Sequence, residues 1–92
     1  MDRKTLEYMD ERVQKAKEII ATIASLAKKA EMIATTSNIS FIDHNLNTKA
    51  TLESRSYSNV RGQENLIKAI KSFAIEEINR EIAALEEELA KL

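Results

Sequence analysis

The chain has 92 residues, and its 14 basic residues against 15 acidic ones exclude a global field that would draw it to nucleic acid or an anionic membrane. The absence of cysteine excludes disulfides, thiolate metal sites and thiol nucleophiles, and the single histidine, His44, is too few for a histidine-based metal site. With 4% aromatic residues, no proline and one glycine, a core must be built from Ile, Leu, Ala and Met, which favours helices.

A chain of this length forms one small domain, residues 1–92, and is short for a core that buries most of its surface alone. We therefore expect help from a second copy. The first residues are charged and the apolar run Ile19 to Ala24 is interrupted by Thr22, so we expect neither a signal peptide nor a membrane-spanning helix. This predicts a cytoplasmic protein.

Residues 2 to about 35 read as one long helix, with Asp2 as N-cap and the polar run from Thr35 to Asn38 as its end. Two apolar stripes follow it, which implies contacts on two sides. The first comprises Leu6, Met9, Val13, Ala16, Ile20, Ile23 and Ala27, and the second comprises Ile19, Ile23, Leu26, Ala30 and Ile33. The several alanines also permit close helix approach, although high helix propensity is enough to explain them.

Residues 39–57 change character. Ile39, Phe41 and Ile42, and later Thr48, Thr51, Leu52 and Tyr57, favour strands, and the residues from His44 to Asn47 favour a turn. This pattern predicts a short β-hairpin, with Ile39 and Phe41 on one face and Ile42 on the other. An ordered but irregular loop is the alternative, because an isolated two-stranded hairpin is marginally stable.

The last helix is expected at about 62 to 91, entered at Asn59 or Gly62, with an apolar seam at alternating spacings of three and four. The seam residues are Ile75, Ile78, Ile82, Leu85, Leu89 and Leu92. The fold class is thus mainly α: an antiparallel pair of long helices with a hairpin or ordered loop between them.

Self-association follows from the apolar residues that one helix pair leaves over. We expect these to be Ile19, Leu26 and Ile33 on the first helix and Leu66, Ile70 and Phe73 on the last. Pairing two chains would bury them in a four-helix bundle, so a dimer or a higher even number is predicted.

The connection before the last helix holds the best candidate site. Arg55, Tyr57, Asn59, Arg61 and Gly62 bring guanidinium groups, a ring, an amide and a helix start into eight residues, which suits a phosphate or carboxylate. No glycine-rich nucleotide motif accompanies them. An ordinary polar connection with exposed arginines is the alternative reading.

Catalytic chemistry is poorly supported. Asp43 and His44 are adjacent, but neighbouring strand residues point to opposite faces, so the carboxylate would not orient the imidazole. The serines lack a nucleophile motif, and the glutamates of the last helix lack the His at i+3 of helical-bundle metal sites. We expect a non-enzymatic protein without cofactor or metal.

The stretches from Ile75 to Ile82 and from Ala84 to Leu92 resemble the acidic, leucine-seamed ends of small uncharacterised helical proteins of bacteriophages and prophages. The resemblance implies a phage or mobile-element accessory protein that binds a host component, and it assigns no functional residue. The order of two long helices around a hairpin is also similar to the topology of prefoldin subunits, whose helices are longer.

The leading hypothesis is a homo-oligomeric interaction protein that binds a partner macromolecule through the hairpin and the adjoining connection. The alternative is a protein that sequesters a small phosphorylated or nucleotide-like ligand. Nucleic-acid binding is a third reading, supported by five basic residues and opposed by the net charge of -1. Those residues are Lys49, Arg55, Arg61, Lys68 and Lys71.

Overall fold

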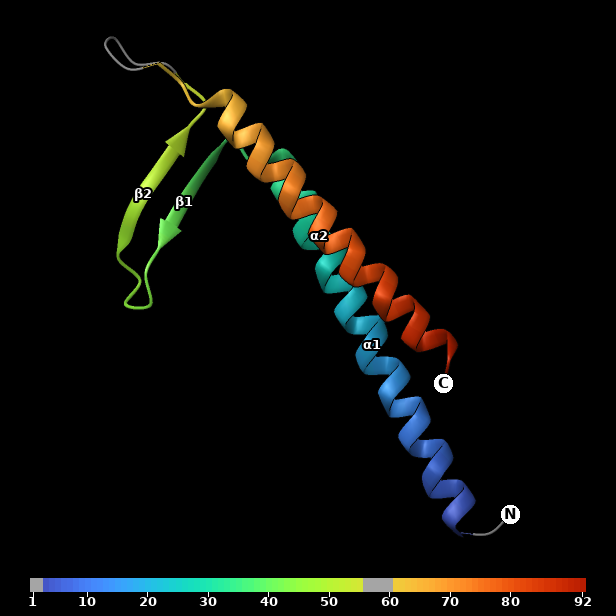
Figure 1. Cartoon of the computed structure of the whole chain (residues 1–92). Helices are drawn as coiled ribbons and strands as arrows, with labels where there is room; N and C mark the ends of the chain where they lie inside the picture. Colours follow the sequence, from blue (N-terminus) through green and yellow to red (C-terminus); the bar gives the residue numbers. More distant parts are fainter. Residues whose placement is uncertain (1–2, 56–60) are drawn as a thin grey trace.

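The computed structural model describes residues 3–55 and 61–92 and confirms the helix–hairpin–helix prediction (Figure 1). Helix α1, Arg3–Thr35, runs along most of the molecule, and α2, Glu64–Ala90, returns antiparallel beside it. Strands β1, Asn38–Ile42, and β2, Thr48–Glu53, form an antiparallel hairpin between them. The chain measures 73 × 27 × 14 Å, so it is a rod rather than a globule.

The seam between the helices uses one of the two stripes expected on α1. Ile19 is buried, and Ile23, Leu26, Ala30 and Ile33 are half-buried against α2. On α2 the expected seam is confirmed, because its residues from Ile75 to Leu92 are half-buried at spacings of three and four. The heptad pattern therefore places both helices in coiled-coil-like contact.

The expected division of the α1 stripes was wrong. Ile19, Leu26 and Ile33 belong to the seam inside one chain and are not left over for a second copy. The more exposed residues belong instead to the first stripe, with Leu6 50%, Val13 53% and Ile20 54% exposed, although its Ala16 and Ile23 are half-buried. The physical reason is the position of α2, which contacts only one side of an α1 surface that is apolar over a wide arc.

Helix α1 extends beyond the end of α2 (Figure 1). The guanidinium of Arg12 donates to the backbone carbonyl of Leu92, so α2 ends beside the third turn of α1. Arg3 forms an ion pair with Glu7 of its own helix, with 3.6 Å between Nε and Oε1. The turns before Arg12 therefore project past the end of α2.

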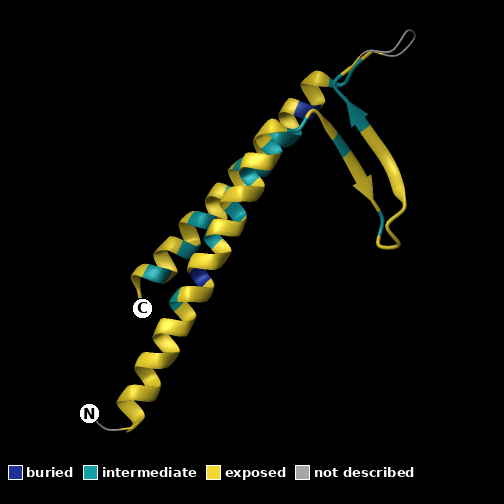
Figure 2. Cartoon of the chain, turned by 180° about the vertical axis from the view of Figure 1, so that it is seen from behind, coloured by how far each residue is buried: buried dark blue, intermediate teal, exposed yellow. Residues whose placement is uncertain are grey.

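Little of the surface is buried within one chain (Figure 2). Among the described residues, the buried hydrophobic ones are Ile19 and Ile67, which are 6% and 3% exposed. The accessible surface is 7633 Å², whereas a compact monomer of this mass exposes about 5,400 Å². Neither described helix is long and apolar enough to cross a membrane.

Candidate functional site

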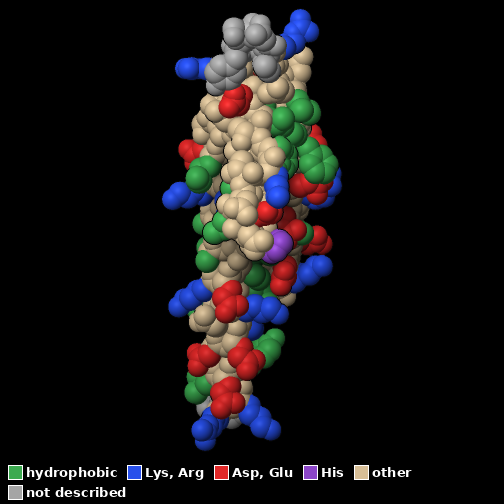
Figure 3. Space-filling view, turned by 90° about the vertical axis from the view of Figure 1, so that its left-hand side faces the viewer, with side chains coloured by type: hydrophobic (Ala, Val, Ile, Leu, Met, Phe, Trp, Pro, Cys, Tyr) green, Lys and Arg blue, Asp and Glu red, His purple; other side chains and the backbone are tan. Residues whose placement is uncertain are grey.

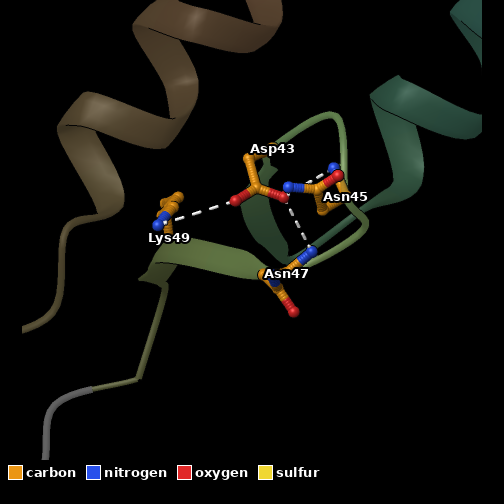
Figure 4. Close-up of polar contacts among 4 residues, drawn as sticks. All are labelled: Asp43, Asn45, Asn47 and Lys49. Atoms are coloured by element: carbon orange, nitrogen blue, oxygen red, sulfur yellow. Dashed lines mark hydrogen bonds and ion pairs between the residues drawn. The ribbon is translucent and has the colours of Figure 1, made fainter.

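The tip of the hairpin is organised by Asp43 (Figure 4). Its Oδ1 accepts hydrogen bonds from the backbone N–H groups of Asn45 and Asn47, both at 2.9 Å, and its Oδ2 lies 3.5 Å from Nζ of Lys49. The Asp43 backbone N–H donates to the carbonyl of Asn47 at 2.9 Å, which closes the turn. Asp43 thus forms an Asx-turn, and both oxygens of its carboxylate make contacts that hold the turn.

Leu46, at the same tip, combines strain with exposure. Its φ is 67°, in the left-handed region that a leucine side chain disfavours, and its side chain is 84% exposed. Asn or Gly would fit this backbone with less strain and would expose no apolar surface. Strained residues of this kind concentrate at functional sites. Leu46 is therefore the residue of the hairpin that folding alone explains least.

The two faces of the hairpin differ in chemistry. The register pairs Ile39 with Leu52 and Phe41 with Ala50, so these four side chains share one apolar face. Ser40 pairs with Thr51 on the other face, and their hydroxyl oxygens are 3.2 Å apart. The register shifts between Phe41 and Ile42, which places a bulge near the tip.

The apolar face overlooks a groove between the hairpin and the helices. The groove has a volume of about 410 Å³ and is lined by Met32, Ile33, Thr36, Asn38, Ile39, Ile70, Lys71 and Ala74. Its lining surface is mainly apolar, and Met32 at its rim is 62% exposed. Phe41 is 48% exposed, so the hairpin does not close onto the helices. The hairpin joins the helix pair at its base and stands away from it (Figures 1 and 2), which leaves this groove open.

The base of the hairpin is fastened to the start of α2. The Gln63 backbone N–H donates to the Glu53 carbonyl at 2.9 Å, and the Glu53 N–H donates to Oε1 of Gln63 at 3.0 Å. Gly62 is required beside this junction, because a Cβ there would lie 2.6 Å from the carbonyl oxygen of Ser54. Gln63 is the N-cap of α2, but its side chain bonds to β2 instead of capping the helix.

The predicted anion site falls partly within the described residues. Tyr57 and Asn59 lie outside the described residues. Arg55 and Arg61 are both exposed, and Gly62 packs against the backbone of Ser54 and Arg55, so the two arginines leave the same junction. They line separate hollows, however.

The hollow beside Arg61 has a volume of about 510 Å³ and is formed by residues 61–66, which include the carboxylate of Glu64. The hollow beside Arg55 is about 250 Å³ and is lined with Ser37, Asn38 and Ser54. Arg55 and Arg61 therefore line two different hollows on the described surface.

Two of the five basic residues, Lys49 and Lys71, make polar contacts within the fold. Nζ of Lys71 donates to the carbonyl of Thr36 at 2.9 Å, which satisfies the end of α1, and Lys49 pairs with Asp43. From the hairpin side, Lys and Arg alternate with Asp and Glu along the rod (Figure 3). Within the described part of the chain, no group of three His, Asp or Glu side chains is arranged to hold a metal ion.

Comparison with protein-family models, with curated proteins and with solved structures found no match for this chain. The candidate site therefore depends on geometry alone. The sequence predicted the turn but not the left-handed backbone of Leu46, because leucine has no preference for a positive φ. It also missed the role of Asp43, for which the spacing Asp-x-Asn-x-Asn was a usable signal.

Proposed function

We propose that this chain is a non-enzymatic interaction protein that works as a homo-oligomer and binds a partner protein through its β-hairpin. The observation that carries the proposal is Leu46, an exposed leucine held in a left-handed backbone at the tip of the hairpin. A residue that adds strain and exposes apolar surface is better explained by a contact with a partner than by folding.

The surroundings of Leu46 support a protein as the partner. Phe41 and Ile42 are 48% and 57% exposed, so exposed apolar side chains lie on both faces of β1 near the tip. The described sheet has two strands, and each has an outer edge that offers backbone hydrogen-bonding groups. An extended segment of a partner can add to such an edge while its side chains enter the groove beneath the hairpin.

Homo-oligomer formation is supported by the large exposed surface. The chain exposes about 2,200 Å² more than a compact monomer of its mass, with a radius of gyration of 19.9 Å where about 12 Å is typical of a compact domain of this length. The resemblance to helical phage proteins fits an accessory protein that acts on a host component in the cytoplasm.

The proposal is tested by capture from a lysate of cells that express the chain, using the wild-type protein, Leu46→Asn and Asn45→Ala. Leu46→Asn removes the apolar tip while suiting the backbone, so lost binding would not reflect unfolding. Asn45→Ala alters a polar side chain of the same turn. We expect one set of proteins to be retained by wild type and Asn45→Ala and lost with Leu46→Asn. Equal capture by all three would reject the hairpin tip as the binding site.

A second candidate function is binding of a small phosphorylated ligand near Arg61. The specific observation in its favour is the polar hollow at the start of α2, although Glu64 opposes an anion there. A thermal-shift screen with nucleotides and pyrophosphate tests it, with Arg61→Ala as the matched variant. A stabilisation that Arg61→Ala abolishes would favour this function over partner binding.

A further inference from the structure

Helix α1 carries an exposed stripe of five residues spaced by seven, which places them in line along one side of the helix. The stripe, called here the α1 stripe, consists of Leu6, Val13, Ile20, Ala27 and Ala34. All five are exposed in the single chain, and the three large residues are each about half exposed. The α1 stripe borders the seam with α2 without taking part in it.

The hairpin lies on the other side of the helix pair. Residues in a helix are about 100° apart, so Met32, which lines the groove under the hairpin, lies across the seam from Ala27 and Ala34. The α1 stripe is therefore on the face of the rod that the hairpin leaves open. On this face α2 contributes small or polar side chains such as Ala69, Ser72 and Asn79, all exposed.

The sizes of the stripe residues are ordered along the helix. Large side chains occupy the first half and alanines the second half, with Ile20 at the centre. If a second α1 lies antiparallel about Ile20, Leu6 meets Ala34, Val13 meets Ala27, and Ile20 meets Ile20. Each large residue then fits against a small one, as close packing of helices requires. A parallel pair would set Leu6 against Leu6 and leave a gap between the alanines.

We propose that the α1 stripe binds the same stripe of a second copy in an antiparallel dimer whose twofold axis passes beside Ile20. The accessible surface supports a second copy as the partner. Each chain exposes about 2,200 Å² more than a compact monomer, which exceeds the roughly 800 Å² that each partner buries in a standard interface. The dimer also covers the first turns of α1, which extend past α2. This proposal rests on the homo-oligomer of the proposed function and specifies which surface the two chains share and how they are oriented.

The arrangement has a consequence for the hairpins. An antiparallel dimer through this face places the two hairpins at opposite ends of the rod, each on a side turned away from the partner chain. Both tips, with Leu46, are then free to bind. The dimer is a bivalent molecule with two equivalent binding sites.

Cross-linking of single-cysteine variants tests the proposal, because the natural chain contains no cysteine. Ile20→Cys is expected to form a covalent dimer with a short bis-maleimide reagent. Glu18→Cys is the matched control, since it lies at nearly the same height but on the opposite side of α1. We expect at least tenfold more dimer from Ile20→Cys. Equal yields from the two variants, or none from Ile20→Cys, would overturn the proposal.

A mixing experiment tests the orientation. Leu6→Cys chains with a size tag are mixed with untagged Ala34→Cys chains before cross-linking. The antiparallel dimer predicts the mixed product in at least tenfold excess over the product of two Ala34→Cys chains. Predominance of the two self-linked products would show a parallel pair and overturn the proposal. Circular dichroism of each variant confirms that the helices are intact.

The two proposals fail separately. Cross-linking is read without any other protein, so its failure would leave the binding role of Leu46 untouched. Loss of partner capture by Leu46→Asn would, conversely, leave the cross-links through α1 unchanged.

Discussion

Gln63 and Glu53 hold each other through two hydrogen bonds, one from the Gln63 backbone N–H to the Glu53 carbonyl and one from the Glu53 N–H to the Gln63 side chain. These bonds join the end of β2 to the start of α2. They fix the ends of the connection that carries Arg55 and Arg61, and they set the position of the hairpin relative to the rod.

Replacing Gln63 by Ala should loosen this junction. The variant leaves the part-buried Glu53 N–H without its acceptor, which costs about 1 to 2 kcal/mol. Amide hydrogen exchange measured by NMR should accelerate at Glu53 and along β2. Gln63→Glu replaces the amide oxygen by a carboxylate oxygen that can still accept this hydrogen bond, and it serves as the control. If Gln63→Ala left the exchange rate at Glu53 unchanged, the side-chain hydrogen bond of Gln63 would not stabilise the hairpin.

Gly62→Ala should displace the same junction for a steric reason. The added Cβ would lie 2.6 Å from the Ser54 carbonyl oxygen, a backbone atom that cannot turn aside. We expect a loss of about 1 to 3 kcal/mol, as for other overpacked sites. Thermal unfolding followed by circular dichroism measures it, with the exposed Ser72→Ala as control. If Gly62→Ala were as stable as wild type, the close contact between residue 62 and the Ser54 carbonyl oxygen would be contradicted.

Neighbouring residues of α2 provide a matched pair for the helix seam. Ile67 is 3% exposed and Leu66 is 49% exposed. Ile67→Ala should therefore lower the free energy of unfolding by about 2 to 4 kcal/mol, whereas Leu66→Ala should change it by no more than about 0.5 kcal/mol. Chemical denaturation of both variants gives the comparison. Equal losses would mean that the seam does not run through Ile67.

The strain at Leu46 predicts a stabilising substitution. Asn tolerates the left-handed conformation better than Leu, so Leu46→Asn should stabilise the hairpin by about 1 kcal/mol. The protection of the β1 and β2 amides against hydrogen exchange reports this change directly. Leu46→Ala, which keeps the strain without the apolar surface, is the control. Reduced protection in Leu46→Asn would show that Leu46 supports the fold, which would weaken its role as a binding residue.

The sequence was sufficient to predict the long helices and the hairpin, because spacing and turn composition are local signals. The seam of α2 followed from alternating spacings of three and four between Ile75 and Leu92. The residues of the α1 seam could not be predicted in this way. Two overlapping stripes have helical spacing, and only the placement of α2 decides which of them forms the seam. For the same reason, the surface left for a second copy was misassigned to Ile19.

The candidate site was less predictable than the fold. Arg55 and Arg61 were singled out by the chemistry of their side chains. Whether they share a pocket depends on the hydrogen bonds between Gln63 and Glu53, which are ten positions apart in the sequence. The exposure and strain of Leu46 depend on the turn that Asp43 organises. Such features arise from the closed backbone of the hairpin and leave no periodic pattern in the sequence.

The molecular mass in solution tests the central claim, that the working form is a dimer joined through the α1 stripe. Light scattering at micromolar concentration should give twice the 10.4 kDa of one chain for the wild-type protein. Ile20→Glu places a charge at the centre of the proposed contact and should give the mass of one chain with its helices retained. A wild-type mass of one chain throughout, or an Ile20→Glu variant that remains a dimer, would contradict the account.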